Sequence, residues 1–217
     1  MSPAGQQTFT DGSKDEAPSE AISQDDRETA SPGRTLGSSV LREVAETALL
    51  ALVVFLILNG LTGRFQVRGS SMEPTLHNGQ YLVVSKLAYW LRPPARGDIV
   101  VFHPPTGVSD DYIKRIVGLP GEQVAVRDGE VFVEGVPLEE SYVVRRGSYS
   151  GTWELGTDEY FVLGDNRESS SDSHTWGTLP GDHIIGKAWV RYWPPTAWGP
   201  VDHGTVLKPS LPGQAAP

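Results

Sequence analysis

A run of apolar residues near the N-terminus constrains this chain more than any other feature of its sequence. Residues 48–58 carry no polar side chain, and the mostly apolar character extends over residues 40–62. A helix that is apolar on every face needs either lipid or a large protein core around it. The extended segment has the roughly 20 residues that a membrane span requires. Its charged residues, Arg42, Glu43 and Glu46, lie in the first turns, where long side chains reach the interface.

We therefore predict a transmembrane helix over residues 40–62, with a buried helix of a globular core as the alternative. The run lies too far from Met1 to fit a removable signal peptide, and no small-x-small site follows it. Residues 1–39 are rich in Ser, Gly, Pro, Asp and Glu with almost no aromatic residues. Such a segment cannot bury enough apolar surface to offset its ordering entropy. We expect it to form a disordered acidic leader.

Short β-strands separated by turns dominate the chain after Phe65. Runs rich in Val, Ile, Phe, Tyr and Trp are typical of strands, and they occupy residues 80–86, 98–103, 112–117, 123–127, 130–134, 159–163 and 187–193. Asp128-Gly129 between two of them is a strong hairpin signal. Strands do not alternate with helices, so we predict a mainly β, antiparallel domain over residues 63–198. The Pro- and Gly-rich residues 199–217 are expected to form a flexible tail.

Composition excludes several classes of function. The formal net charge is -9 and no basic stripe is visible, which argues against a nucleic-acid partner. The absence of cysteine excludes disulfides and cysteine nucleophiles. The five histidines show no metal-ligand spacing. We expect neither a metal nor a cofactor.

Three sequence blocks carry the residues that could perform chemistry: residues 68–76 with Ser71, residues 111–121 with Lys114, and the polar residues 164–174. A serine hydroxyl is a poor nucleophile until a base removes its proton. A lysine can be that base when burial lowers its pKa, and serine with lysine forms a known nucleophilic pair without histidine.

Lys114 has a setting that suits this role. In a strand over residues 112–117, Tyr112, Lys114 and Ile116 share one face, while Arg115 points the opposite way and can pair with a carboxylate. Each block also has a simpler interpretation: Ser71 as a turn residue, Lys114 as a solvated lysine on an edge strand, and the third block as a solvent loop. A triad of Ser71, His174 and Asp172 is a further alternative.

Taken together, the blocks resemble the bacterial type I signal peptidase (leader peptidase) family. The resemblance covers most of the chain after residue 40. It rests on Gly69-x-Ser71-Met72-x-Pro74-Thr75-Leu76, on residues 96–102, on residues 112–115 and on Gly164-Asp165-Asn166-Arg167-x-x-Ser170-x-Asp172-Ser173. Four such blocks in this order behind an apolar segment are very specific.

The resemblance implies a membrane-bound serine endopeptidase that removes signal peptides from exported preproteins after small-x-small sites. It implies the signal-peptidase type of antiparallel β fold, with Ser71 as nucleophile and Lys114 as general base. Ser170 would orient the lysine, and the Ser71 main-chain N–H would donate to the oxyanion. Arg115 would pair with Asp165, and Asp172 would brace the loop. The apolar substrate pockets would be lined by Phe65, Val67, Met72, Leu76, Leu82, Tyr112 and Ile113.

Three departures from the family pattern matter. Gly69 stands where some relatives have a serine whose hydroxyl completes the oxyanion hole, so a second donor must come from elsewhere. His174 stands where arginine is common, so an ion pair with Asp172 would depend on pH. Glu168-Ser169 replaces the common Asp-Asn. The segment between Val117 and Gly164 is short, which predicts a small hairpin lobe around residues 121–158.

The family also implies a location and partners. We expect a single-pass protein of the bacterial cytoplasmic membrane, with the leader in the cytoplasm and the catalytic domain outside. Its partners would be preproteins, the lipid bilayer and the secretion translocon. One alternative is a catalytically silent paralogue that binds preproteins or secretion machinery. Another is a self-cleaving SOS-type repressor, which would need a DNA-binding module and no membrane span.

Overall fold

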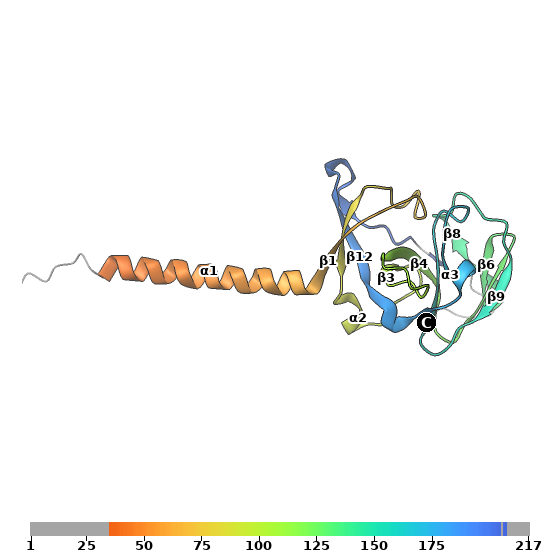
Figure 1. The fold of residues 1–217 in the computed structure, drawn as a ribbon, viewed down its shortest axis with the longest axis horizontal. Coiled ribbons are helices and arrows are strands. Elements are labelled where there is room, and N and C mark those ends of the chain that lie inside the picture. Colours follow the sequence, from red (N-terminus) through yellow and green to blue (C-terminus); the bar gives the residue numbers. More distant parts are fainter. Residues whose placement is uncertain (1–34, 205, 208–217) are drawn as a thin grey trace, which may run out of the picture. The chain divides into compact units, whose positions relative to one another are not determined.

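The computed structural model of this chain describes residues 35–204 and 206–207 (Figure 1). It divides into two compact units, residues 1–48 and residues 49–217, and each is described by itself. The predicted acidic leader over residues 1–39 lies outside the described residues except for its last five. Those five begin helix α1, which spans Thr35–Leu61.

Helix α1 contains the apolar run. Its segment Ser39–Leu61 is 23 residues long, with a mean hydropathy of 2.2 and no buried part. In the described part of the chain it is the one helix long and apolar enough to cross a membrane. Arg42 Nε lies 2.7 Å from Glu46 Oε1, one helical turn away, so two of its few charges neutralise each other. The segment agrees with the predicted span to within one residue at each end.

An antiparallel sheet of eight strands forms the main part of the second unit. Its order is β1-β2-β12-β3-β4-β10-β11, with β13 paired to β12. The bounds are β1 Thr62–Gln66, β2 Tyr81–Ser85, β3 Ile99–Phe102, β4 Tyr112–Gly118, β10 Glu159–Leu163, β11 Leu179–Pro180, β12 Ile184–Trp193 and β13 Gly199–Pro200. Short helical turns are α2 Ala88–Leu91, α3 Ser173–Trp176, η1 Gly181–His183 and η2 Pro195–Ala197.

A second, four-stranded sheet lies at the other end of this unit from β1 (Figure 1). Its order is β7-β6-β5-β9, with β5 Gln123–Arg127, β6 Glu130–Val133, β7 Val136–Pro137 and β9 Gly151–Glu154. The β5–β6 turn is Asp128-Gly129, with φ of 51° and 76°, which is the geometry of a tight two-residue hairpin turn. The lobe expected around residues 121–158 is therefore a four-stranded sheet and larger than one hairpin.

Three clusters of buried apolar residues hold the strands together. One joins the second sheet to β10 through residues such as Val124 and Phe161. Another packs the segment after β1 against β2 and β12, and includes Val67, Met72 and Leu82. The third lies between β3, β4 and β10. Lys114 and Arg115 therefore belong to a strand with buried residues on both faces.

Every predicted strand is present, with ends that differ by at most three residues. The prediction of a flexible tail from residue 199 is wrong for the described residues beyond that point. β13 pairs with β12, Val201 is buried, and β14 (Val206–Leu207) pairs with β8 (Glu139–Glu140). His203 Nδ1 accepts from Ile99 N–H at 3.0 Å. Burial, aided by Lys187, lowers the pKa of His203 to about 4, which keeps the ring neutral for this bond. Residues 208–217 lie outside the described residues.

Candidate active site

Ser71 lies in a tight turn between β1 and β2. Gly69, two residues earlier, has a φ of 85°, a left-handed conformation that favours glycine. Its N–H donates to Asn78 Oδ1 at 3.0 Å, which closes the turn. Met72 and Leu76 are fully buried on the inner side. The turn is thus anchored from below, and a serine at position 69 would be strained.

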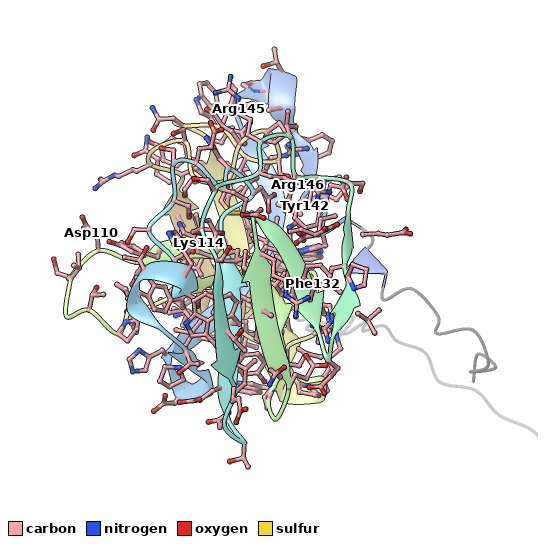
Figure 2. All side chains as sticks on the ribbon, turned by 90° about the vertical axis from the view of Figure 1, so that its right-hand side faces the viewer. Asp110, Lys114, Phe132, Tyr142, Arg145 and Arg146 are labelled. Atoms are coloured by element: carbon pink, nitrogen blue, oxygen red, sulfur yellow. The ribbon has the colours of Figure 1, made fainter. Side chains whose placement is uncertain are left out.

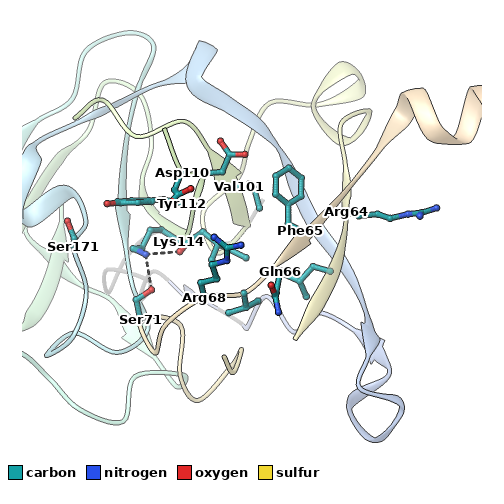
Figure 3. Close-up of a pocket in the computed structure, with 14 residues that line it drawn as sticks. Arg64, Phe65, Gln66, Arg68, Ser71, Val101, Asp110, Tyr112, Lys114 and Ser171 are labelled. Carbon is teal, nitrogen blue, oxygen red and sulfur yellow. Dashed lines mark hydrogen bonds between the residues drawn. The ribbon is translucent and has the colours of Figure 1, made fainter. Parts of the chain in front are cut away.

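Lys114 approaches Ser71 from strand β4. Its Nζ lies 2.9 Å from Ser71 Oγ and 2.9 Å from the Ile113 carbonyl oxygen (Figure 3). Lys114 is only 5% exposed, and Figure 2 shows it inside the body of the domain. Desolvation lowers the pKa of Lys114 to about 8, although the negative charges of Asp172 and Asp165 oppose that shift. A small fraction of this lysine is therefore neutral at pH 7, far more than for a solvated lysine with the ordinary pKa of 10.5, and the neutral fraction grows as the pH approaches 8.

The loop over residues 164–174 is joined directly to the Ser71 turn. Asn166 N–H donates to the Ser71 carbonyl at 3.0 Å, and Asn166 Nδ2 donates to the Ser70 carbonyl at 3.2 Å. Gly164 makes the closest approach: a Cβ at this position would lie 2.5 Å from the Ser71 carbonyl oxygen and 2.3 Å from Ser170 Oγ. The loop over residues 164–174 therefore supports the turn over residues 68–76 that carries Ser71.

Arg115 and Asp165 form a buried, two-pronged ion pair. Arg115 Nε donates to Asp165 Oδ1 at 2.8 Å, and Nη2 donates to Oδ2 at 2.7 Å. Both side chains are at most 1% exposed. Thr75 Oγ1 donates to the same carboxylate at 2.5 Å, and the Arg115 guanidinium stacks 3.8 Å from the centre of the Tyr142 ring. This pair ties β4 to the loop on the side opposite to Lys114, as the strand alternation predicts.

Asp172 braces the loop from within. One carboxylate oxygen accepts from Gly164 N–H at 2.9 Å, and the other lies 2.6 Å from His174 Nδ1. The His174 ring stacks on Tyr149 with centroids 3.9 Å apart. His174 stands where arginine is common in the family, and its ring is the group that contacts Asp172 here.

Two hydrogen-bond arrangements considered from the sequence are not formed in the structure. Ser170 Oγ is buried but makes no hydrogen bond to any described residue, so the expected bond to Lys114 is not formed here. The alternative triad is not assembled either. Ser71 Oγ is bonded to Lys114, while the two His174 ring nitrogens lie next to Asp172 and Thr175 Oγ1.

A groove of about 450 Å³ opens beside Ser71 and Lys114. Of the seven predicted pocket residues, Phe65, Val67, Leu82, Tyr112 and Ile113 line it. Met72 and Leu76 do not, because both are packed into the apolar cluster beneath the turn. Seven residues that were not predicted as pocket residues also line the groove: Arg64, Gln66, Arg68, Val101, Asp110, Asp111 and Ser171. Most of these directly flank the predicted pocket residues, which is the signal that was overlooked.

Comparison with known proteins places the chain in a family. The family of signal peptidase, peptidase S26, matches residues 41–193. A probable signal peptidase I-2 of Synechocystis is 38% identical over 175 residues, which are 77% of this chain and 80% of that protein. The signal peptidase I of Leptolyngbya laminosa is 41% identical over 165 residues, covering 72% and 81%. A signal peptidase IB of Staphylococcus aureus is 30% identical over 174 residues, covering 71% and 90%.

The chain therefore belongs to the signal peptidase family, peptidase S26. This membership confirms the family predicted from the sequence blocks, and with it the assignment to the serine peptidases.

Proposed function

We propose that this protein is a membrane-anchored serine endopeptidase that removes signal peptides from exported preproteins after small-x-small sites. The single observation that carries the proposal is the 2.9 Å contact between Lys114 Nζ and Ser71 Oγ in a buried setting. A buried lysine with a lowered pKa can accept a proton that a solvated lysine cannot.

In the proposed reaction, neutral Lys114 takes the proton from Ser71 Oγ as that oxygen attacks the scissile carbonyl carbon. The lysine then gives the proton to the leaving amine, and the peptide bond breaks to leave an ester on Ser71. The same lysine removes a proton from water as the water oxygen attacks the ester carbon. It then returns this proton to the departing Ser71 Oγ, which frees the signal peptide and restores neutral Lys114. No step draws on a metal or cofactor.

Ser170 is proposed to hold the lysine after proton transfer. An ammonium group has three N–H donors, and Lys114 Nζ has two partners, Ser71 Oγ and the Ile113 carbonyl. The buried Ser170 Oγ is an acceptor without a partner among the described residues. It can therefore accept the third N–H when Lys114 becomes charged.

The Ser71 main-chain N–H is proposed to donate to the oxyanion of the tetrahedral intermediate. The Ser71 carbonyl is held by Asn166 N–H at 3.0 Å, which fixes the plane of the next peptide and the orientation of the turn. Because Gly69 carries no hydroxyl, a second donor has to come from another group. The Arg115–Asp165 pair and Asp172 are proposed to keep the turn and loop in place.

Two free strand edges at the groove suit an extended substrate. Tyr112–Lys114 pairs with β3 on one side, while β10 pairs with β4 only from Arg115 onward. Among the strands that the structure describes, β1 lies at the edge of its sheet and pairs with β2 alone. A signal peptide can add main-chain hydrogen bonds there. Shallow apolar pockets built from residues such as Phe65 and Ile113 would then exclude large side chains at the first and third positions before the cut.

The apolar helix supports a membrane location for the enzyme. We assign residues 40–62 as the span, residues 1–39 as a cytoplasmic leader and the β-rich domain from residue 63 as the extracytoplasmic peptidase domain. This orientation in the cytoplasmic membrane brings the groove to exported chains as they leave the translocon, with the lipid bilayer as the second partner.

The test is cleavage of a preprotein with an Ala-x-Ala site by the detergent-solubilised full chain and by Ser71→Ala. Mass spectrometry locates the cut. We expect cleavage after the second alanine by the wild type, none by the variant, and none when that alanine is replaced by phenylalanine. Cleavage by Ser71→Ala at the wild-type rate would refute the proposed nucleophile. Binding of several preproteins without turnover would instead support a silent paralogue.

A further inference from the structure

Charged side chains line the groove beside Ser71, and most of them are engaged or turned away. Lys114 Nζ is bonded to Ser71 Oγ, and Asp111 Oδ1 lies 2.7 Å from His103 Nδ1. Arg64 points away from the groove in Figure 3. Arg68 and Asp110 remain as charges that can meet a bound substrate.

Of Arg68 and Asp110, Arg68 carries the positive charge. It lies two residues after the end of β1, is exposed, and lines the groove. Its guanidinium makes no ion pair or hydrogen bond with any residue in the described part of the chain. Figure 3 shows its side chain directed into the groove, between Ser71 and Phe65. Asp110 belongs to the loop that leads into β4, on the other side of the groove (Figures 2 and 3).

The spacing along the chain limits where Arg68 can act. Arg68 lies three positions before Ser71 in the chain, so their Cα atoms are at most about 11 Å apart. An extended substrate advances about 3.3 Å per residue. Because the Arg68 side chain is directed into the groove beside Ser71 (Figure 3), Arg68 meets the substrate within a few residues of the bond that Ser71 attacks.

We propose that Arg68 is a specificity-determining residue that favours preproteins with an acidic side chain close to the cleaved bond. This inference rests on the proposed function, because it concerns the same groove. A guanidinium offers a planar fork of N–H donors that matches a carboxylate. Closure of the groove by a bound peptide removes water around the pair and strengthens it. The Asp110 carboxylate on the opposite side repels an acidic side chain, so the preference is expected at one position and not along the whole peptide.

The experiment compares peptides that share one Ala-x-Ala site and differ by a single Glu or Gln. The variable positions are the second before the cut and each of the first three after it. The readout is the ratio of kcat/KM for the Glu and Gln peptides. For the wild type we expect about a tenfold preference for Glu at one of these positions, the factor that one charge-assisted hydrogen bond typically contributes.

Variants separate Arg68 from the general charge of the groove. In Arg68→Gln the ratio should fall to about one, and Arg68→Glu should instead prefer Lys to Gln at the same position. Arg64→Gln removes an equal charge four residues away and should keep the wild-type ratio. The wild-type preference should also weaken as salt is raised, since a partly exposed pair is screened.

Two results would overturn the inference: a wild-type ratio near one at all four positions, or a preference that survives in Arg68→Gln. Neither result would touch the proposed function, which fails only if the Gln peptides are not cut after the second alanine or if Ser71→Ala still cuts them. The two claims therefore fail in different measurements.

Discussion

Replacement of Lys114 by methionine should abolish activity and yet stabilise the folded protein at neutral pH. Burial lowers the pKa of Lys114 from the ordinary 10.5 to about 8, and each pKa unit corresponds to about 1.4 kcal/mol. Ionised Lys114 therefore costs the folded state about 3 kcal/mol at pH 7. Methionine has a similar volume and removes this cost. It also removes the two hydrogen bonds of Nζ, which contribute about 1 kcal/mol each, so the net gain at pH 7 is about 1 kcal/mol.

The pH dependence of the stability difference between wild type and Lys114→Met is the sharper test. Contributions that do not change with pH, such as packing, cancel when this difference is compared between two pH values. The folded state releases the lysine proton near pH 8 and the unfolded state near pH 10.5. Between these values the unfolded state binds more protons, so wild-type stability rises with pH relative to the variant. The penalty is complete below about pH 8 and is gone above about pH 10.5. Between about pH 8 and pH 10.5 the free energy of unfolding of the wild type should therefore rise by about 3 kcal/mol relative to that of Lys114→Met.

The measurement is urea unfolding of the full chain in mild detergent, followed by tryptophan fluorescence at several pH values from 7 to 10.5. Lys86→Met is the matched control, because Lys86 is exposed and its charge stays in water in both states. A difference between wild type and Lys114→Met that does not change with pH would refute the argument that burial makes this lysine a base.

Three further predictions concern the same site. The wild-type kcat/KM should rise with pH and level off above about 8, because only neutral Lys114 is active; a rate that stays flat down to pH 5 would contradict this. Asp165→Asn should lower the free energy of unfolding by about 3–5 kcal/mol in urea titrations, because it leaves the Arg115 charge buried without its partner; a loss below 1 kcal/mol would show that the pair is dispensable. Gly164→Ala should reduce kcat/KM about 100-fold, because the added methyl group displaces the Ser71 carbonyl. In the control Gly156→Ala, the methyl group meets only the movable end of Glu159, and equal losses in the two variants would argue against a role for close packing at the nucleophile.

The strands were predictable because most are short β-branched or aromatic runs between strong turn signals. Asp128-Gly129 is the clearest case, since both residues adopt the positive φ that such a turn demands. β1 was missed because its first residues, Thr62 to Arg64, resemble the polar end of the span. The tail beyond residue 199 was misjudged because its anchors are main-chain pairs, the buried Val201 and the bond from Ile99 N–H to the His203 ring, none of which composition reveals.

The pairing of Ser71 with Lys114 and the opposite direction of Arg115 could be inferred from the serine and lysine blocks and from strand alternation, whereas Asp165 was named as the partner of Arg115 from the family resemblance. Met72 and Leu76 were assigned to the groove on the family resemblance alone. Their side chains face the core because the turn folds over an apolar cluster. Arg68 was passed over because a charged residue in a sequence is usually solvated, and only the three-dimensional arrangement shows that it lines the groove.

The most direct test of the account is the rate of preprotein cleavage by Lys114→Arg at pH 8. Arginine keeps the positive charge and most of the volume but does not deprotonate in proteins, so it cannot act as a base. The account predicts a rate at least about 100-fold below that of the wild type, with the fold retained. Cleavage by Lys114→Arg at the wild-type rate would contradict the proposal that Lys114 takes the proton from Ser71.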